Sequence, residues 1–126
     1  MDKQDKIGIL LIDDDNEVLE ALGKVVELTG WKCFKAPTGE IGLDIFRINK
    51  IDAAVVDINL PKSDGFEIMK QMKQLKPNVP VIVLTGLGYE KEQVEKAVAL
   101  GASGYVSKAM PVKDAITKIK AVLGRR

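Results

Sequence analysis

Aspartate side chains follow two of the apolar runs in this chain of 126 residues. Asp13–Asp15 come directly after the run Gly8–Ile12, and Asp57 comes directly after Ala53–Val56. Short β-branched runs are typical of buried strands, and open parallel sheets bind ligands at the carboxyl ends of their strands. Carboxylates about 4 Å apart repel each other by roughly 4 kcal/mol at an effective dielectric constant of about 20. The sequence therefore predicts an acidic pocket that binds a cation or shares a proton.

Thr85 and Lys108 follow two further strand-like runs, so the same edge of a parallel sheet would collect them. A pair of acids at that edge suits Mg²⁺, which binds few protein carboxylates and keeps several waters. Asp57 could act as a nucleophile toward phosphorus and form an acyl phosphate. The Lys108 ammonium would offset charge on phosphoryl oxygens, and the Thr85 hydroxyl could donate to one of them. These residue types favour phosphoryl chemistry at a magnesium site.

Apolar runs and helical periodicity alternate five times along the chain. The predicted strands cover about residues 8–12, 31–35, 53–56, 81–84 and 103–107. The predicted helices cover about residues 16–29, 38–48, 64–75, 90–100 and 111–123. Thr38 and Asp64 are good helix caps, Pro111 suits a first helical turn, and Gly30 and Gly101 are typical helix ends. Five strand–helix pairs imply right-handed parallel crossovers, so we predict an α/β fold with one doubly wound, five-stranded parallel sheet and five helices.

The length and charge of the chain limit its class. With 126 residues, it is long enough for one domain and too short for two, and we expect order from about residue 7 to residue 123. A net charge of +1 gives no electrostatic signature of nucleic-acid or membrane binding, and no apolar stretch approaches the roughly 20 residues that span a bilayer. The absence of histidine excludes histidine ligands, bases and phosphorylation sites within the chain. The single Cys33 excludes a disulfide framework and suits a reducing compartment, so we predict a cytoplasmic location.

Four segments together resemble one known family. They are Ile9–Asp15, Asp52–Pro61 with the following Asp64 and Gly65, Val83–Gly86, and Gly101–Lys108. Each segment is weakly specific alone, but their order and spacing are highly specific and extend over essentially the whole chain. On these segments, the chain resembles the receiver domain of two-component response regulators. The resemblance implies a CheY-like, flavodoxin-like topology with the strand order 2-1-3-4-5.

The resemblance implies a role for each aspartate of the acidic pocket. Asp57 resembles the phosphoacceptor, which receives a phosphoryl group from the phosphohistidine of a sensor histidine kinase or phosphotransfer protein. Asp13 and Asp14 resemble the acidic pair that binds Mg²⁺, together with Asp57 and the backbone carbonyl of Asn59. Asp15 supports this site or caps the following helix. Such a domain is a switch with self-catalysed phosphorylation and dephosphorylation, and not a multiple-turnover enzyme.

The resemblance also implies which residues form the switch. Lys108 and Thr85 resemble the residues that contact the phosphoryl group, and Thr85 would turn toward it after transfer. Tyr105 resembles the aromatic switch residue, whose ring moves inward as the threonine shifts. That movement changes the surface of the fourth helix, the fifth strand and the fifth helix. An output protein or domain, or a second copy of the chain, usually docks there.

One residue departs from the family pattern. Ala109 follows Lys108, where the family usually has proline and often a cis peptide bond. A cis bond before a residue other than proline costs about 3–4 kcal/mol, so a trans bond and a strained cis bond are both open. Both a stand-alone receiver and a part of a longer regulator or hybrid kinase are consistent with these motifs.

Two other classes of protein share parts of the pattern. Asp13 and Asp15 match the two aspartates of haloacid dehalogenase-type phosphatases, but Glu17 stands where that motif has threonine or valine, and the chain is short for that fold. A flavodoxin-like flavin protein would have the same topology, but the consecutive acids after the first strand would repel the phosphate of FMN. Steady release of phosphate from a phosphomonoester would indicate the phosphatase, and a yellow colour would indicate the flavin protein.

Overall fold

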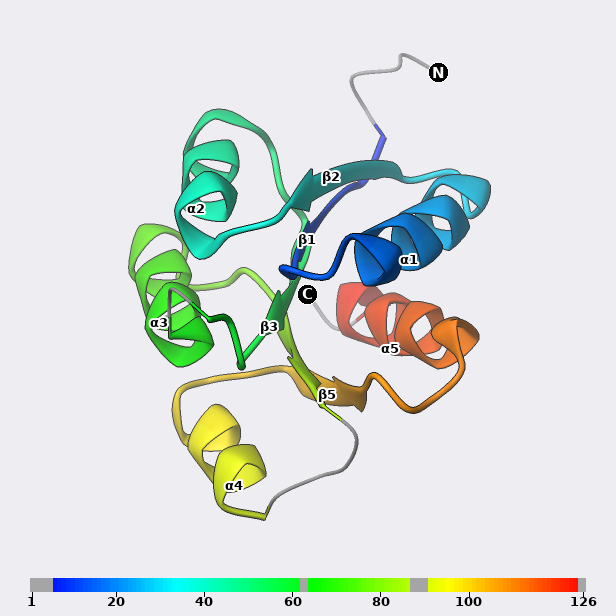
Figure 1. Ribbon diagram of the computed structural model, residues 1–126. Coiled ribbons are helices and arrows are strands. Elements are labelled where there is room, and N and C mark those ends of the chain that lie inside the picture. Colours follow the sequence, from blue (N-terminus) through cyan, green and yellow to red (C-terminus); the bar gives the residue numbers. More distant parts are fainter. Residues whose placement is uncertain (1–5, 62–63, 87–90, 125–126) are drawn as a thin grey trace.

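The computed structural model describes residues 6–61, 64–86 and 91–124, and in these ranges five strands alternate with five helices (Figure 1). The strands are β1 (Gly8–Ile12), β2 (Lys32–Ala36), β3 (Ala53–Asp57), β4 (Val81–Thr85) and β5 (Gly104–Ser107). The helices are α1 (Asn16–Leu28), α2 (Gly39–Ile48), α3 (Gly65–Leu75), α4 (Lys91–Ala99) and α5 (Val112–Gly124). None of these helices is long and apolar enough to span a membrane.

All five strands run parallel in one sheet, in the order β2-β1-β3-β4-β5. This arrangement confirms the predicted α/β class, the doubly wound sheet and the strand order. Helices α1 and α5 cover one face of the sheet, and α2, α3 and α4 cover the other (Figure 1). The strand order reverses between β1 and β3, and ligands of such sheets bind beside the carboxyl ends of the strands at this point.

The inner strands β1, β3 and β4 serve both faces of the sheet, because successive side chains of a strand point to opposite sides. Leu10 and Val56 pack in the cluster with α2 and α3. Their neighbours Ile9 and Val55 pack in the second cluster, with α1 and α5. Every residue of the three inner strands is buried. Burial on both faces explains why these strands appear in the sequence as continuous apolar runs.

Polar caps begin the helices that flank the central strands. Thr38 is the N-cap of α2 and its hydroxyl accepts from the backbone N–H of Ile41 at 3.1 Å. Asp64 is the N-cap of α3 and accepts from the backbone N–H of Phe66 at 2.9 Å. Both predicted caps are thus confirmed. Pro111 lies just before α5 and not within its first turn as predicted, and the predicted start of the fourth helix near residue 90 lies outside the described residues.

Glycines in the left-handed region follow two of the helices. Gly30 has φ of 99° after α1, and Gly101 has φ of 94° after α4. A side chain would be strained at these angles, so both positions favour glycine. The two predicted helix ends are confirmed.

Cys33 lies in the edge strand β2 and is a free, partly buried thiol. Burial raises its pKa to about 11, so the thiol form prevails at neutral pH. Cys33 is therefore an ordinary unreactive thiol in this strand.

Gly65 allows α3 to begin directly against the end of β3. A Cβ atom at this position would collide with the backbone carbonyl of Asp57 and the Cα of Ile58. We therefore expect Gly65→Ala to lower the free energy of unfolding by about 1–3 kcal/mol, as overpacking typically does. Urea denaturation followed by circular dichroism measures this change.

Gly124→Ala is the matched control, because no atom lies within 4 Å of a Cβ built at Gly124. It should leave the free energy of unfolding unchanged or raise it by up to about 1 kcal/mol, since alanine favours the helix. Equal stability of Gly65→Ala and the unchanged chain would contradict the close contact between α3 and β3.

Candidate functional site

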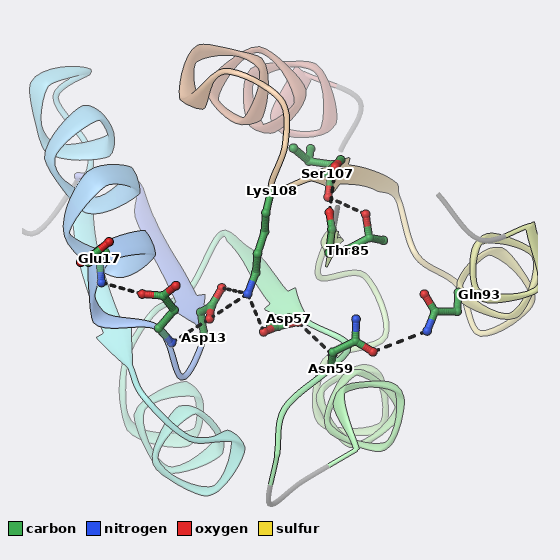
Figure 2. A network of polar contacts seen from close by, with 11 residues as sticks. Asp13, Glu17, Asp57, Asn59, Thr85, Gln93, Ser107 and Lys108 are labelled. Atoms are coloured by element: carbon green, nitrogen blue, oxygen red, sulfur yellow. Dashed lines mark hydrogen bonds and ion pairs between the residues drawn. The ribbon is translucent and has the colours of Figure 1, made fainter. Parts of the chain in front are cut away.

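The polar residues singled out in the sequence lie at the carboxyl ends of four strands (Figure 2). Asp13 follows β1, Asp57 ends β3, Thr85 ends β4 and Lys108 follows β5. Because the strands are parallel, these ends share one edge of the sheet. The structure therefore brings together residues from Asp13 to Lys108 that are far apart along the chain.

The Lys108 ammonium lies between two buried carboxylates (Figure 2). Its Nζ is 3.0 Å from Oδ2 of Asp57 and donates a hydrogen bond to that atom. It also lies 3.0 Å from Oδ2 of Asp13 and donates to Oδ1 of the same side chain at 3.2 Å. Asp13 and Asp57 are each 1% exposed. The cation thus connects the ends of β1 and β3 with the segment after β5.

The pKa values of Asp13 and Lys108 are both raised, but for different reasons. Burial raises the pKa of the Asp13 carboxyl, against the opposing effects of the Asp15 backbone N–H and Lys108. Burial alone would lower the pKa of Lys108, but its hydrogen bonds to Asp13 and Asp57 and their charges outweigh this effect and raise the pKa. Lys108 therefore stays a cation at neutral pH.

Backbone N–H groups orient both buried carboxylates. Oδ1 of Asp13 accepts from the N–H of Asp15 at 2.9 Å, and Oδ1 of Asp57 accepts from the N–H of Asn59 at 2.8 Å. In each case the donor lies two residues after the aspartate, which is the pattern of an Asx-turn. Asp15 repeats the pattern as the N-cap of α1, accepting from the N–H of Glu17 at 2.9 Å. Asp15 therefore caps α1 and also holds Asp13 through its backbone.

Three carboxylates of this cluster fit a metal ion. Asp13, Asp14 and Asp57 each offer an oxygen, and these oxygens lie within 4.8 Å of one another. Oδ2 of Asp13 is buried and accepts no hydrogen bond, although it is in ion-pair contact with Lys108. Asp14 is exposed, so its carboxylate can approach a bound ion from the solvent side. An all-oxygen donor set with an under-used buried oxygen suits a hard cation such as Mg²⁺.

Thr85 and Tyr105 lie on the neighbouring strands β4 and β5. Thr85 is 1% exposed and its hydroxyl donates to the carbonyl of Val106 at 3.4 Å. Tyr105 is paired in register with Val83 and is 37% exposed. The hydroxyl of Thr85 is therefore engaged with β5 in this structure, and Tyr105 is partly exposed.

The structure also shows contacts at the site that sequence reasoning missed. Asn59 Oδ1 accepts a hydrogen bond from Nε2 of Gln93 on α4 at 3.5 Å (Figure 2). Ser107 forms two hydrogen bonds beside Lys108, and the only signal for it was a serine directly before that lysine. The described residues contain no cis peptide bond, so the bond between Lys108 and Ala109 is trans.

Comparison with known proteins assigns the family. The family model described as the response regulator receiver domain matches residues 9–120 of this chain. Transcriptional regulatory protein RprY of Bacteroides fragilis is 30% identical over 125 residues, which cover 99% of this chain and 52% of RprY. Transcriptional regulatory protein CpxR of Escherichia coli is 34% identical over 117 residues, which cover 93% of this chain and 49% of CpxR. The CheY-like receiver domain from Methanospirillum hungatei superposes with a TM-score of 0.89 at 28% identity, over 95% of each chain.

The chain therefore belongs to the response regulator receiver family, and it is a receiver domain of the two-component type. It spans about half the length of the curated relatives that it matches.

Asp13→Asn should stabilise the fold in the absence of metal. Because burial raises the folded-state pKa of Asp13, the stability that this carboxyl contributes is present below its ordinary pKa of 3.8 and is lost as the pH rises through the folded value. At pH 7 in EDTA, we expect a higher urea midpoint for Asp13→Asn than for the unchanged chain. Mg²⁺ at about ten times its Kd should add about 1.4 kcal/mol to the unfolding free energy of the unchanged chain, and Asp13→Asn should lose this gain.

Asp14→Asn is the matched control, because Asp14 is exposed. In EDTA it should change the free energy of unfolding by less than about 0.5 kcal/mol, and it should still weaken the stabilisation by Mg²⁺. A lower urea midpoint for Asp13→Asn in EDTA would contradict the electrostatic cost of the buried carboxylate. An undiminished Mg²⁺ effect in both variants would contradict the metal site.

Proposed function

We propose that this receiver domain is a Mg²⁺-dependent phosphoryl-accepting switch and that Asp57 is the phosphoacceptor. The phosphoryl donor would be the phosphohistidine of a sensor histidine kinase or of a phosphotransfer protein. The observation that supports this best is the position of the Asp57 carboxylate, which is buried at the end of β3, 3.0 Å from the Lys108 ammonium and close to the carboxylates of Asp13 and Asp14. The cytoplasmic location stays a prediction from the sequence.

The Asp57 carboxylate would act as the nucleophile in phosphoryl transfer. One of its oxygens forms a bond to phosphorus, the P–N bond to the donor imidazole breaks, and the imidazole nitrogen keeps the electron pair. Asp13, Asp14, Asp57 and the backbone carbonyl of Asn59 would hold Mg²⁺, which supplies positive charge for the phosphoryl oxygens. Lys108 Nζ already contacts Asp57 Oδ2 at 3.0 Å, so it can reach an oxygen of a phosphoryl group attached there.

Water would later hydrolyse the acyl phosphate and regenerate the Asp57 carboxylate. Each phosphorylation thus consumes the acceptor until it is reset, so the domain acts as a switch and not as a multiple-turnover enzyme. The phosphatase alternative would need both Asp13 and Asp15 for its motif. Asp15 instead caps α1 through its contact with the N–H of Glu17, which makes that alternative less favourable.

The signal would pass from Thr85 to Tyr105. A phosphoryl oxygen on Asp57 offers the Thr85 hydroxyl a charged acceptor, which binds more strongly than the carbonyl of Val106 at 3.4 Å. As Thr85 turns, the Tyr105 ring would move inward and change the surface of α4, β5 and α5. An output protein, an output domain or a second copy of the chain would recognise this surface. We expect no direct contact of this domain with nucleic acid, because its net charge is +1.

Phosphorylation should require Asp57. Incubation of the chain with acetyl phosphate and Mg²⁺ should add one phosphoryl group, which intact-mass spectrometry detects, and Asp57→Asn should abolish it. Asp15→Asn is the matched control, because asparagine also caps helices and should leave the added mass in place. Labelling that persists in Asp57→Asn would overturn the assignment of the acceptor.

Tyr105 should become protected when the phosphoryl mimic beryllofluoride binds. Oxidative footprinting with mass spectrometry measures the modification of Tyr105, which starts 37% exposed. We expect at least about a twofold fall in its oxidation, as expected when a ligand shifts a two-state equilibrium. Thr85→Val keeps the shape of the threonine without its hydroxyl and should remove the protection. Unchanged oxidation of Tyr105 at saturating beryllofluoride would argue against the switch.

A further inference from the structure

The hydroxyl of Ser107 connects two chain segments at the edge of the site. Ser107 is the last residue of β5, directly precedes Lys108 and is 4% exposed. Its Oγ donates to the carbonyl of Gly86 at 2.9 Å and accepts from the N–H of Ala109 at 3.1 Å. A hydroxyl has one proton to donate and two lone pairs, so both bonds form at once. Figure 2 shows Ser107 beside Thr85 and above the Lys108 side chain.

Ser107 also begins the turn that carries Lys108. The N–H of Met110 donates to the carbonyl of Ser107 at 3.1 Å, which closes a four-residue turn over residues 107–110. Serine is favoured at the first position of such turns, and its side chain strengthens them by accepting from the third residue, here Ala109. A proline at position 109 would have no N–H for this bond. Alanine at position 109 therefore keeps the backbone N–H that donates to the Ser107 hydroxyl.

The turn determines where the Lys108 side chain starts. The backbone N–H of Lys108 donates to the carbonyl of Thr85 at 3.0 Å, and Ser107 Oγ holds the next carbonyl of the same segment, that of Gly86. These two hydrogen bonds join the end of β4 and the residue after it to the end of β5 and the turn that follows. The Lys108 side chain is long and flexible, so a fixed backbone limits the positions that its ammonium can reach.

We propose that Ser107 is a positioning residue for phosphoryl transfer, whose hydroxyl fixes the Lys108 turn against Gly86 and thereby places the Lys108 ammonium at Asp57. This inference rests on the proposed function, in which Asp57 accepts the phosphoryl group and Lys108 contacts it. Ser107 touches neither group through its side chain. Because Gly86 follows Thr85, the same hydroxyl also joins the Lys108 turn to the segment of the switch threonine.

The test separates the rate of phosphorylation from the binding of Mg²⁺. Phosphorylation by acetyl phosphate is followed by intact mass over a range of Mg²⁺ concentrations, for the unchanged chain and for Ser107→Ala. We expect the maximal rate of Ser107→Ala to fall about tenfold, because small displacements of a positioned group have large effects on rate. The half-saturating Mg²⁺ concentration should stay within about twofold, because the proposed metal ligands belong to the β1 and β3 segments.

Two further variants distinguish positioning from a general loss of packing. Ser107→Thr keeps the hydroxyl and should restore the maximal rate to within about twofold of the unchanged chain. Ser103→Ala removes another serine next to β5, away from the site, and should leave the rate unchanged. Thermal unfolding checks that each variant is folded. If Ser107→Ala does not fold, Ser107→Cys takes its place and should show the same fall in rate.

Three results would overturn the inference. The first is a maximal rate of Ser107→Ala equal to that of the unchanged chain. The second is an equal loss of rate in Ser107→Ala and Ser107→Thr, and the third is a weakening of Mg²⁺ binding in proportion to the rate. Absence of phosphorylation in the unchanged chain would instead overturn the proposed function, and the role of Ser107 with it.

Discussion

The contact of one ammonium with two buried carboxylates is the constraint on which the rest of this structure depends. Lys108 lies 95 residues from Asp13 and 51 residues from Asp57 along the chain, yet its Nζ donates to both. Two carboxylates that are each 1% exposed would repel each other strongly without this cation. The parallel sheet is needed because only its order places the ends of β1, β3 and β5 at one edge. The site therefore exists only when the whole sheet is formed.

The site gives up stability for its chemistry. Burial opposes the ionised form of Asp13 and raises its pKa, and Oδ2 of Asp13 accepts no hydrogen bond. Backbone N–H groups of Asp15 and Asn59 hold the other oxygens in place without adding a competing side chain. Such a site keeps excess negative charge that a metal ion can neutralise. Its carboxylates are already oriented before the ion binds. Functional sites commonly lower the folding stability of a protein where activity and stability conflict.

Much of the fold was predictable because its signals are local. The inner strands are apolar on both faces, so they appear as uninterrupted runs, and Thr38, Asp64, Gly30 and Gly101 mark helix boundaries through single residues. The strand order, in contrast, leaves no local signal in the sequence. Pairing of β1 with both β2 and β3 joins distant segments, and only the resemblance to receiver domains predicted it.

The polar residues of the site could be predicted in type and place, but not in their contacts. Asp57 and Lys108 follow apolar runs and so had to lie at the carboxyl edge. The bonds of Ser107, and the bond of the Thr85 hydroxyl to Val106, depend on turn geometry and on the pairing of β4 with β5. Neither is visible in composition or periodicity. The trans bond before Ala109 likewise required the structure.

Helix α4 is the most weakly anchored helix of the described part of the chain. Of its residues Lys91–Ala99, Ala97 is buried, while Val98 is 60% exposed. Its side-chain contacts with the rest of the fold include the Lys96 ammonium, 4.6 Å from the centre of the Phe66 ring, and the bond from Gln93 to Asn59. Segments with few buried apolar contacts are displaced at the lowest free-energy cost. The sheet edge therefore joins two parts of unequal firmness, because α4 can shift at lower cost than the strands that helices cover on both faces.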